Sequence, residues 1–143
     1  TESISSAFEM FENIRFGEAG TLAVSSAITS ILKNIPVKKI GYCGLMLPVL
    51  EDIGLAKCAK ENRLNISNLL LFSSVCGTGI DCVPLAGNIS FEKIEWLLRD
   101  VAQMSIRLQK PLSVRVFPIP GKQEGEVTEF DSPYLVNTRI FSL

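Results

Sequence analysis

The most chemically versatile segment of the chain begins at Cys76 and reads Cys-Gly-Thr-Gly-Ile-Asp-Cys-Val-Pro. The thiol of Cys76 and the carboxylate of Asp81 are its candidate catalytic groups, because Cys76 stands just before two glycines, where loop geometry could expose the sulfur. We expect Gly77, Thr78 and Gly79 to contact a substrate, since glycine lets a backbone approach a ligand closely. The alternative is a buried Cys76 beside a tight structural turn.

The complete absence of histidine narrows the possible chemistry. It removes the commonest general base near neutral pH, every Ser-His-Asp arrangement and most zinc sites. The four cysteines lie 15, 18 and 6 residues apart, which does not reproduce the paired spacing of metal or redox motifs. We therefore predict no metal site, and no cofactor is indicated. Burial is the plainer interpretation of all four thiols, and a disulfide between Cys76 and Cys82 is a further alternative.

Arg115 is the candidate group for binding an anion. Its guanidinium matches a carboxylate or phosphate, although within an apolar run it could equally face solvent or need a buried structural partner. Asp81 likewise faces a ligand or bonds the amides of its own loop. Glu51 and Asp52 could act as an acid and base pair, but the dipole of a helix that starts nearby already explains two carboxylates there.

The spacing of apolar residues predicts the elements that position these side chains. Helices are expected over residues 3–16, 24–34, 48–62, 68–74 and 90–108. Strands are expected over 37–42 and 112–117, with a final strand over 134–141 and exposed polar chain over 122–129. Residues 76–84 are predicted to form a loop, because they contain two glycines and a proline. Helices that alternate with short apolar strands indicate an α/β fold with a mainly parallel sheet.

Composition excludes two classes of partner. The chain has 143 residues, 47% of them hydrophobic and 20% charged, with a net charge of -1. Such a balance provides no positive field for nucleic acid or for an anionic membrane surface, and no apolar run is long enough to span a bilayer. The apolar surplus is therefore expected to form a core or an interface. The length corresponds to a single domain over residues 1–143.

Four blocks of sequence resemble domain of unknown function 711, also called uncharacterised protein family 0210. They read GEAGTLAVSSAIT at 17–29, GYCGLMLPVLEDIGLA at 41–56, VCGTGIDCVPLAG at 75–87 and KPLSVRVFPIPGKQEGE at 110–126. The resemblance implies the C-terminal part of a longer protein, with a fold similar to pyruvate formate-lyase-like proteins. This chain would then be one sector of a mainly parallel α/β barrel-like sheet, with helices packed on the outside.

The resemblance does not imply any particular reaction for this chain. Adjacent cysteines and a glycyl-radical segment are absent from the sequence, so the similarity of fold does not imply radical chemistry. Cys76, Gly77, Gly79, Asp81 and Pro84 match the third block.

We therefore expect a cytoplasmic, enzyme-like protein that binds a small molecule near the segment from Cys76 to Asp81. The alternative is a non-catalytic oligomeric module, whose partner is a second copy or the missing N-terminal part of the same protein. The chain starts at Thr1 without a methionine, which favours a fragment boundary over the other interpretation, an N-terminal threonine nucleophile.

Overall fold

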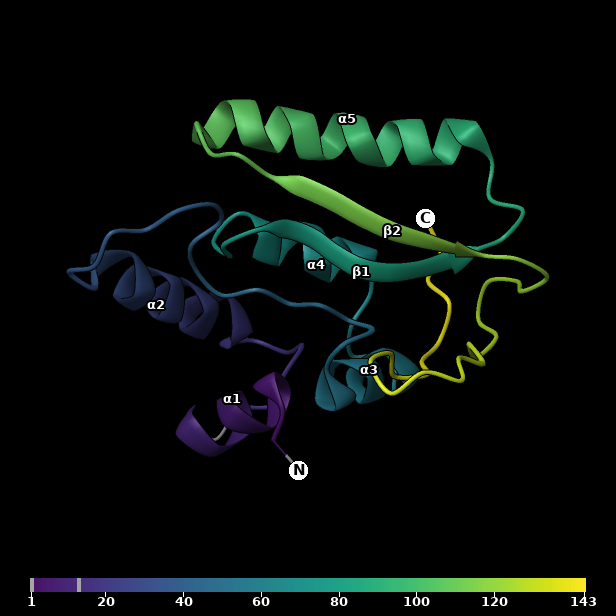
Figure 1. The fold of residues 1–143 in the computed structure, drawn as a ribbon, viewed down its shortest axis with the longest axis horizontal. Helices are drawn as coiled ribbons and strands as arrows, with labels where there is room; N and C mark the ends of the chain where they lie inside the picture. The colour runs from purple at the N-terminus through teal and green to yellow at the C-terminus, as the bar shows by residue number, and fades with distance from the viewer. Residues whose placement is uncertain (1, 13) are drawn as a thin grey trace.

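A computed structural model describes residues 2–12 and 14–143 (Figure 1). Thr1, a candidate nucleophile from the sequence, lies outside the described residues. The chain forms a mixed α/β structure. Its elements in order are α1 (Ile4–Glu12), α2 (Thr21–Asn34), α3 (Ile53–Lys60), α4 (Ile66–Ser73), β1 (Gly79–Ala86), α5 (Phe91–Leu108) and β2 (Ser113–Ile119).

Strands β1 and β2 pair in parallel and are joined by the crossover helix α5, which runs along the β2 side of the sheet in Figure 1. All eight residues of β1 are buried, whereas β2 is only partly covered. On the edge of β1 away from β2, the amides of Val49 and Leu50 donate to the carbonyls of Asp81 and Cys82, each at 3.2 Å. Strand β1 is therefore the central element of the structure.

The loop predicted over residues 76–84 is wrong in its larger part, because residues 79–84 belong to β1. Its glycine and proline resemble turn signals, but here they serve a buried strand. Gly79 lies so close to β2 that a Cβ atom would overlap the carbonyl oxygen of Ser113. Pro84 has no amide to pair, and its carbonyl accepts a hydrogen bond from Phe141 at 3.0 Å.

Two of the predicted strands are also wrong. Residues 37–42 form no strand, and Val37, Ile40 and Tyr42 are exposed, because no described segment offers them a backbone to pair with. The final strand predicted over 134–141 is reduced to single bridges at Arg139 and Phe141. An apolar run becomes a strand only when a neighbouring edge is within reach.

The predicted helices are all present, with boundaries set by their caps. Helix α3 begins five residues later than the predicted residue 48, because the Asp52 side chain accepts from the Leu55 amide at 2.8 Å and so caps the helix. Helix α4 starts at Ile66, capped by Asn65 rather than by Ser67. The predicted strand over 112–117 corresponds to β2, which continues through Pro118 to Ile119.

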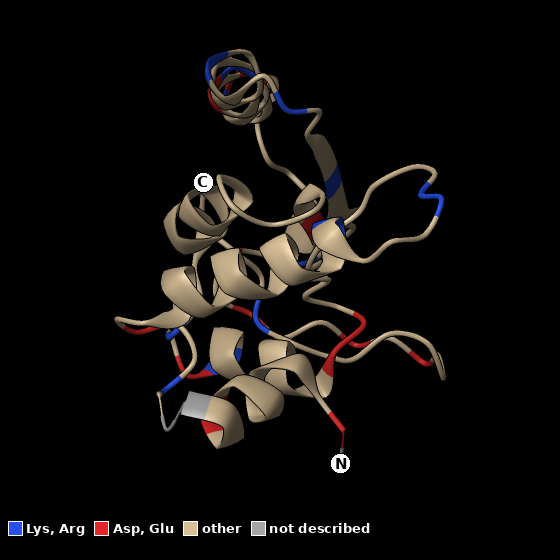
Figure 2. Ribbon diagram, turned by 90° about the vertical axis from the view of Figure 1, so that its left-hand side faces the viewer, with Lys and Arg blue, Asp and Glu red and all other residues tan. Residues whose placement is uncertain are grey.

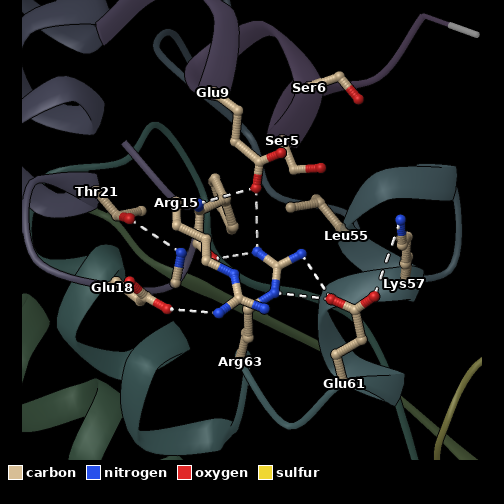
Figure 3. Close-up of polar contacts among 12 residues, drawn as sticks. Ser5, Ser6, Glu9, Arg15, Glu18, Thr21, Leu55, Lys57, Glu61 and Arg63 are labelled. Carbon is tan, nitrogen blue, oxygen red and sulfur yellow. Dashed lines mark hydrogen bonds and ion pairs between the residues drawn. The ribbon is translucent and has the colours of Figure 1, made fainter. Parts of the chain in front are cut away.

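A half-exposed cluster of charges fastens α1 and the turn before α2 to the end of α3 (Figure 3). The well-buried Arg63 guanidinium contacts Glu9 at 3.1 Å and Glu61 at 2.8 Å, and it donates to the carbonyl of Phe16 at 2.6 Å. Because one side chain joins three segments, this cluster fixes α1 and the turn before α2 against the end of α3.

Within the part of the chain that the structure describes, no helix combines the length and apolar character needed to cross a membrane.

Replacing Gly79 by alanine is expected to destabilise the fold by clearly more than about 1 kcal/mol, the usual cost of a backbone misfit. Gly79 has a φ of +126°, and the added Cβ would overlap β2. The matched control is Gly121→Ala, where φ is +76° but no atom lies within 4 Å of the new Cβ. Urea unfolding of both variants measures the difference, and equal losses would contradict the close-approach argument.

Candidate functional site

The turn that leads into β1 is closed by the thiol of Cys76. The sulfur is buried and accepts a hydrogen bond from the Gly79 amide at 3.2 Å. No hydrogen bond connects this sulfur to Asp81 or Arg115 among the described residues. The contacts of Cys76 are therefore those of a residue that shapes the turn, and they agree with the alternative of a buried thiol.

Gly77 and Thr78 occupy the same turn but have different surroundings. Gly77 crosses Gly44 so closely that a Cβ on Gly77 would lie 2.7 Å from the Gly44 carbonyl carbon. The crossing fixes the segment after residue 42 against the start of β1. Thr78 is buried, and its hydroxyl has no hydrogen-bond partner within the described residues. A buried hydroxyl without a partner is uncommon in a folded protein.

A β-bulge lies at the centre of the candidate site. Ile80 pairs with Val114 and Val83 pairs with Val116, so that two residues of β1 face Arg115 alone. One of these two is Cys82, whose φ of +51° is left-handed, an uncommon conformation for a residue other than glycine. Bulges of this kind re-aim side chains, and strained backbone is concentrated at functional positions.

The bulge brings Asp81 and Arg115 together. Nε and Nη2 of Arg115 both contact Oδ1 of Asp81 at 2.6 Å, and Nη1 lies 3.3 Å from Oε1 of Glu51. The Asp81 side chain is only 6% exposed, whereas that of Arg115 is 51% exposed and that of Glu51 is 41% exposed. One buried carboxylate thus holds a cation whose outer side remains open to solvent. We call Glu51, Asp81, Cys82 and Arg115 the bulge cluster.

The electrostatics of the bulge cluster favour a charged arginine and a neutral thiol. The hydrogen bond to Asp81, more than any other contact, raises the pKa of Arg115. Burial raises the pKa of the Cys82 thiol, and its hydrogen bond to Glu51 at 3.0 Å acts in the same direction. Cys82 is therefore a hydrogen-bond donor to Glu51 and not a thiolate nucleophile near neutral pH.

The structure unites only part of the predicted site. Asp81 and Arg115 are in contact, so Asp81 binds a side chain of β2 rather than the amides of its own loop. Sequence reasoning missed Glu51, because the helix-dipole explanation covered Glu51 and Asp52 equally. Only Asp52 is the helix cap, while Glu51 stands in the preceding turn. The sequence did contain a signal for Glu51. Only one of two adjacent carboxylates can occupy the N-cap position of a helix, so the other must have a different partner.

All four cysteines are free, so the disulfide alternative between Cys76 and Cys82 is wrong. Across residues 2–12 and 14–143, no three histidine, cysteine or acidic side chains gather as metal ligands.

The fold and the bulge cluster define a mixed α/β protein built on a small parallel sheet. The chain belongs to the family described as Uncharacterised ACR (DUF711), whose sequence pattern matches residues 1–132. The resemblance seen in the sequence is thereby confirmed at the level of the family.

Its relatives include a UPF0210 protein of Limosilactobacillus reuteri, 33% identical over 131 residues, which are 85% of this chain and 29% of the relative. A UPF0210 protein of Pyrobaculum aerophilum is 28% identical over 137 residues, which are 93% of this chain and 31% of the relative. A third, from Syntrophobacter fumaroxidans, is 31% identical over 131 residues, covering 85% of this chain and 28% of the relative. The chain thus spans less than a third of the length of these relatives, whose names state no activity. No solved structure was found to match it significantly.

Native-state labelling with a thiol reagent at pH 7 is expected to modify Cys43 first, because it is the only one of the four thiols that is partly exposed. Cys76 should react as slowly as the buried Cys58, and mass spectrometry of the digested protein identifies the sites. In Cys43→Ser the fast phase should disappear. A Cys76 that reacts as fast as Cys43 would contradict the turn-closing role and support a reactive thiol.

Proposed function

We propose that this chain supplies a small-molecule site to a larger α/β protein, with Arg115 recognising a carboxylate of the ligand. The observation that supports this is the half-open ion pair of the bulge cluster. Asp81 fixes one side of the guanidinium from a buried position, and Nη1 faces the weaker, more exposed contact with Glu51. A ligand carboxylate would compete with Glu51 for the planar donor edge.

In this proposal Asp81 is a positioning residue, because its carboxylate touches Arg115. A catalytic role for Cys76 and Asp81 stays a prediction from the sequence. So does substrate contact by the turn from Gly77 to Gly79, for which the partnerless hydroxyl of Thr78 is the supporting observation. A cytoplasmic location also stays a prediction.

The proposal includes a larger structural context. We infer that the β1–α5–β2 unit is a sector of a barrel-like sheet, similar to pyruvate formate-lyase-like proteins, and comes from the C-terminal part of a longer chain. The supporting observations are that β2 pairs with β1 alone among the described residues, and that the relatives are much longer. Strand β2 is only partly covered, whereas the strands of parallel sheets are normally buried on both faces.

The alternative function, an oligomeric module, is favoured by the apolar surface of α5. Phe91 is 92% exposed, and Ile106 and Trp96 are also exposed on this helix, which buries only Leu97 and Val101. Isolated apolar residues are normal at a surface, but several on one helix beside an open sheet edge indicate an interface. The proposed partner is a second copy of the chain, or the remaining part of the longer protein.

Small mono- and dicarboxylates are expected to raise the melting temperature of the chain, and Arg115→Lys should remove this response. Lysine keeps the charge but lacks the planar pair of donors that matches a carboxylate. Asp81→Asn should also weaken the response, because it no longer holds the guanidinium. The control is Arg107→Lys on α5, which should respond as the unsubstituted chain does. A full response in Arg115→Lys would exclude Arg115 as the recognition group.

The isolated chain is expected to associate at micromolar concentration, and the double change Phe91→Ser with Ile106→Ser should shift it towards the monomer. Both side chains are exposed on α5, so the change removes apolar surface without opening the core. Sedimentation velocity measures the distribution. Tyr134→Ser, at an exposed position outside α5, is the matched control. A monomeric unsubstituted chain would contradict self-association.

A further inference from the structure

A cleft of about 450 Å³ opens where the last turn of α2 meets the chain that leads into β2. Lys33 lies in the last turn of α2, and Lys110 lies in the segment between α5 and β2. Tyr42, Cys43 and Gly77 form the wall between them. We call this the lysine cleft. Its volume falls within the range of small-molecule sites.

The lysine cleft is positive although the chain as a whole carries a net charge of -1. No aspartate or glutamate occurs in residues 19–50, 62–80 or 101–123, the three stretches that supply its lining. Figure 2 shows acidic and basic residues in several parts of the ribbon. The cleft is therefore a local concentration of positive charge.

The two lysines are poorly compensated within the described residues. The lysine ion pairs of the structure involve Lys57, Lys93 and Lys122. Lys110 is half-buried and donates to the carbonyl of Ser73 at 2.8 Å, which fixes its ammonium group. Burial lowers the pKa of Lys110, and the neighbouring charge of Lys33 lowers it further, partly offset by Cys76. An anion between the two lysines would relieve this repulsion.

The wall of the lysine cleft is built by close backbone contacts. The crossing of Gly44 and Gly77 holds the segment that carries Tyr42 and Cys43, and the Leu45 amide donates to the hydroxyl of Thr29 at 3.1 Å. Thr78, which follows the lining residue Gly77 in the chain, has a buried hydroxyl without a partner among the described residues, an observation independent of the charges. A wall held by close backbone contacts keeps the shape that a ligand site requires.

We propose that the lysine cleft binds a small molecule through a phosphate group. Two point charges without an arginine suit a tetrahedral dianion better than a planar carboxylate, which favours the guanidinium fork. The cleft is larger than inorganic phosphate, so the natural ligand carries an organic part, which lies against Tyr42. This site is separate from the bulge cluster, and the inference does not rest on the function proposed there.

The test is calorimetric titration of the 143-residue chain with inorganic phosphate at an ionic strength held constant with sodium chloride. Lys110→Gln should weaken phosphate binding by about tenfold, the usual effect of losing one charge-assisted contact. Lys33→Gln removes an exposed charge and should weaken it several-fold while leaving the fold intact. The matched control is Lys60→Gln, at an exposed position at the end of α3, which alters the net charge equally.

Each outcome decides the proposal. Weakening in both cleft variants, with unchanged binding in Lys60→Gln and in Arg115→Lys, supports a phosphate site distinct from the bulge cluster. Absence of phosphate binding, equal weakening in Lys60→Gln, or unchanged binding in both cleft variants overturns it. Because the bulge cluster is itself proposed to bind carboxylates, succinate is compared with phosphate in Arg115→Lys, and succinate that binds this variant as tightly as phosphate overturns the choice of ligand class. Circular dichroism of each variant separates lost binding from lost fold, and Lys33→Gln decides the matter if Lys110→Gln does not fold.

Discussion

The complete burial of strand β1 is the constraint on which the rest of the structure depends. A strand covered on both faces and paired on both edges must find partners for its backbone groups, because an unpaired buried amide or carbonyl is costly. It finds them in β2, in residues 49–50 and in Phe141, which come from widely separated parts of the chain. The helices then close the faces, with α4 packed on β1 and α5 packed on β2.

The same constraint explains the chemistry of the site. Asp81 lies on a buried strand, so its charge needs a partner, and the bulge turns it towards Arg115 on the neighbouring strand β2. The left-handed conformation of Cys82 permits this geometry and directs the thiol to Glu51. The bulge cluster is thus a consequence of how a buried carboxylate is accommodated, and it leaves the outer side of Arg115 open to solvent.

Helices were the part of the fold most readily predicted from the sequence, because their apolar stripe is a local property. The prediction over residues 90–108 agrees with α5 almost to the residue, including the stop before Pro111. Strands were harder, because an edge to pair with is not encoded locally. Residues 37–42 have the composition of a strand without a neighbour, whereas β1 contains turn-forming residues and still forms a strand through its burial.

The candidate site shows the same division. Asp81 and Arg115 were predicted as candidate residues from their types, but their contact depends on the register of β1 against β2, which no local pattern encodes. Glu51 joins them only because residues 49–50 run along the other edge of β1.

The partners of β1 come from distant parts of the chain, and this has a consequence for biosynthesis. The helical contact between Arg63 and Glu9 is available once the first half of the chain has left the ribosome, but β1 is not fully paired until Phe141 has been made. During translation the apolar residues of β1 are therefore made before all of their backbone partners exist. The nascent chain depends on early helical packing, or on a chaperone, to prevent this strand from pairing with another molecule.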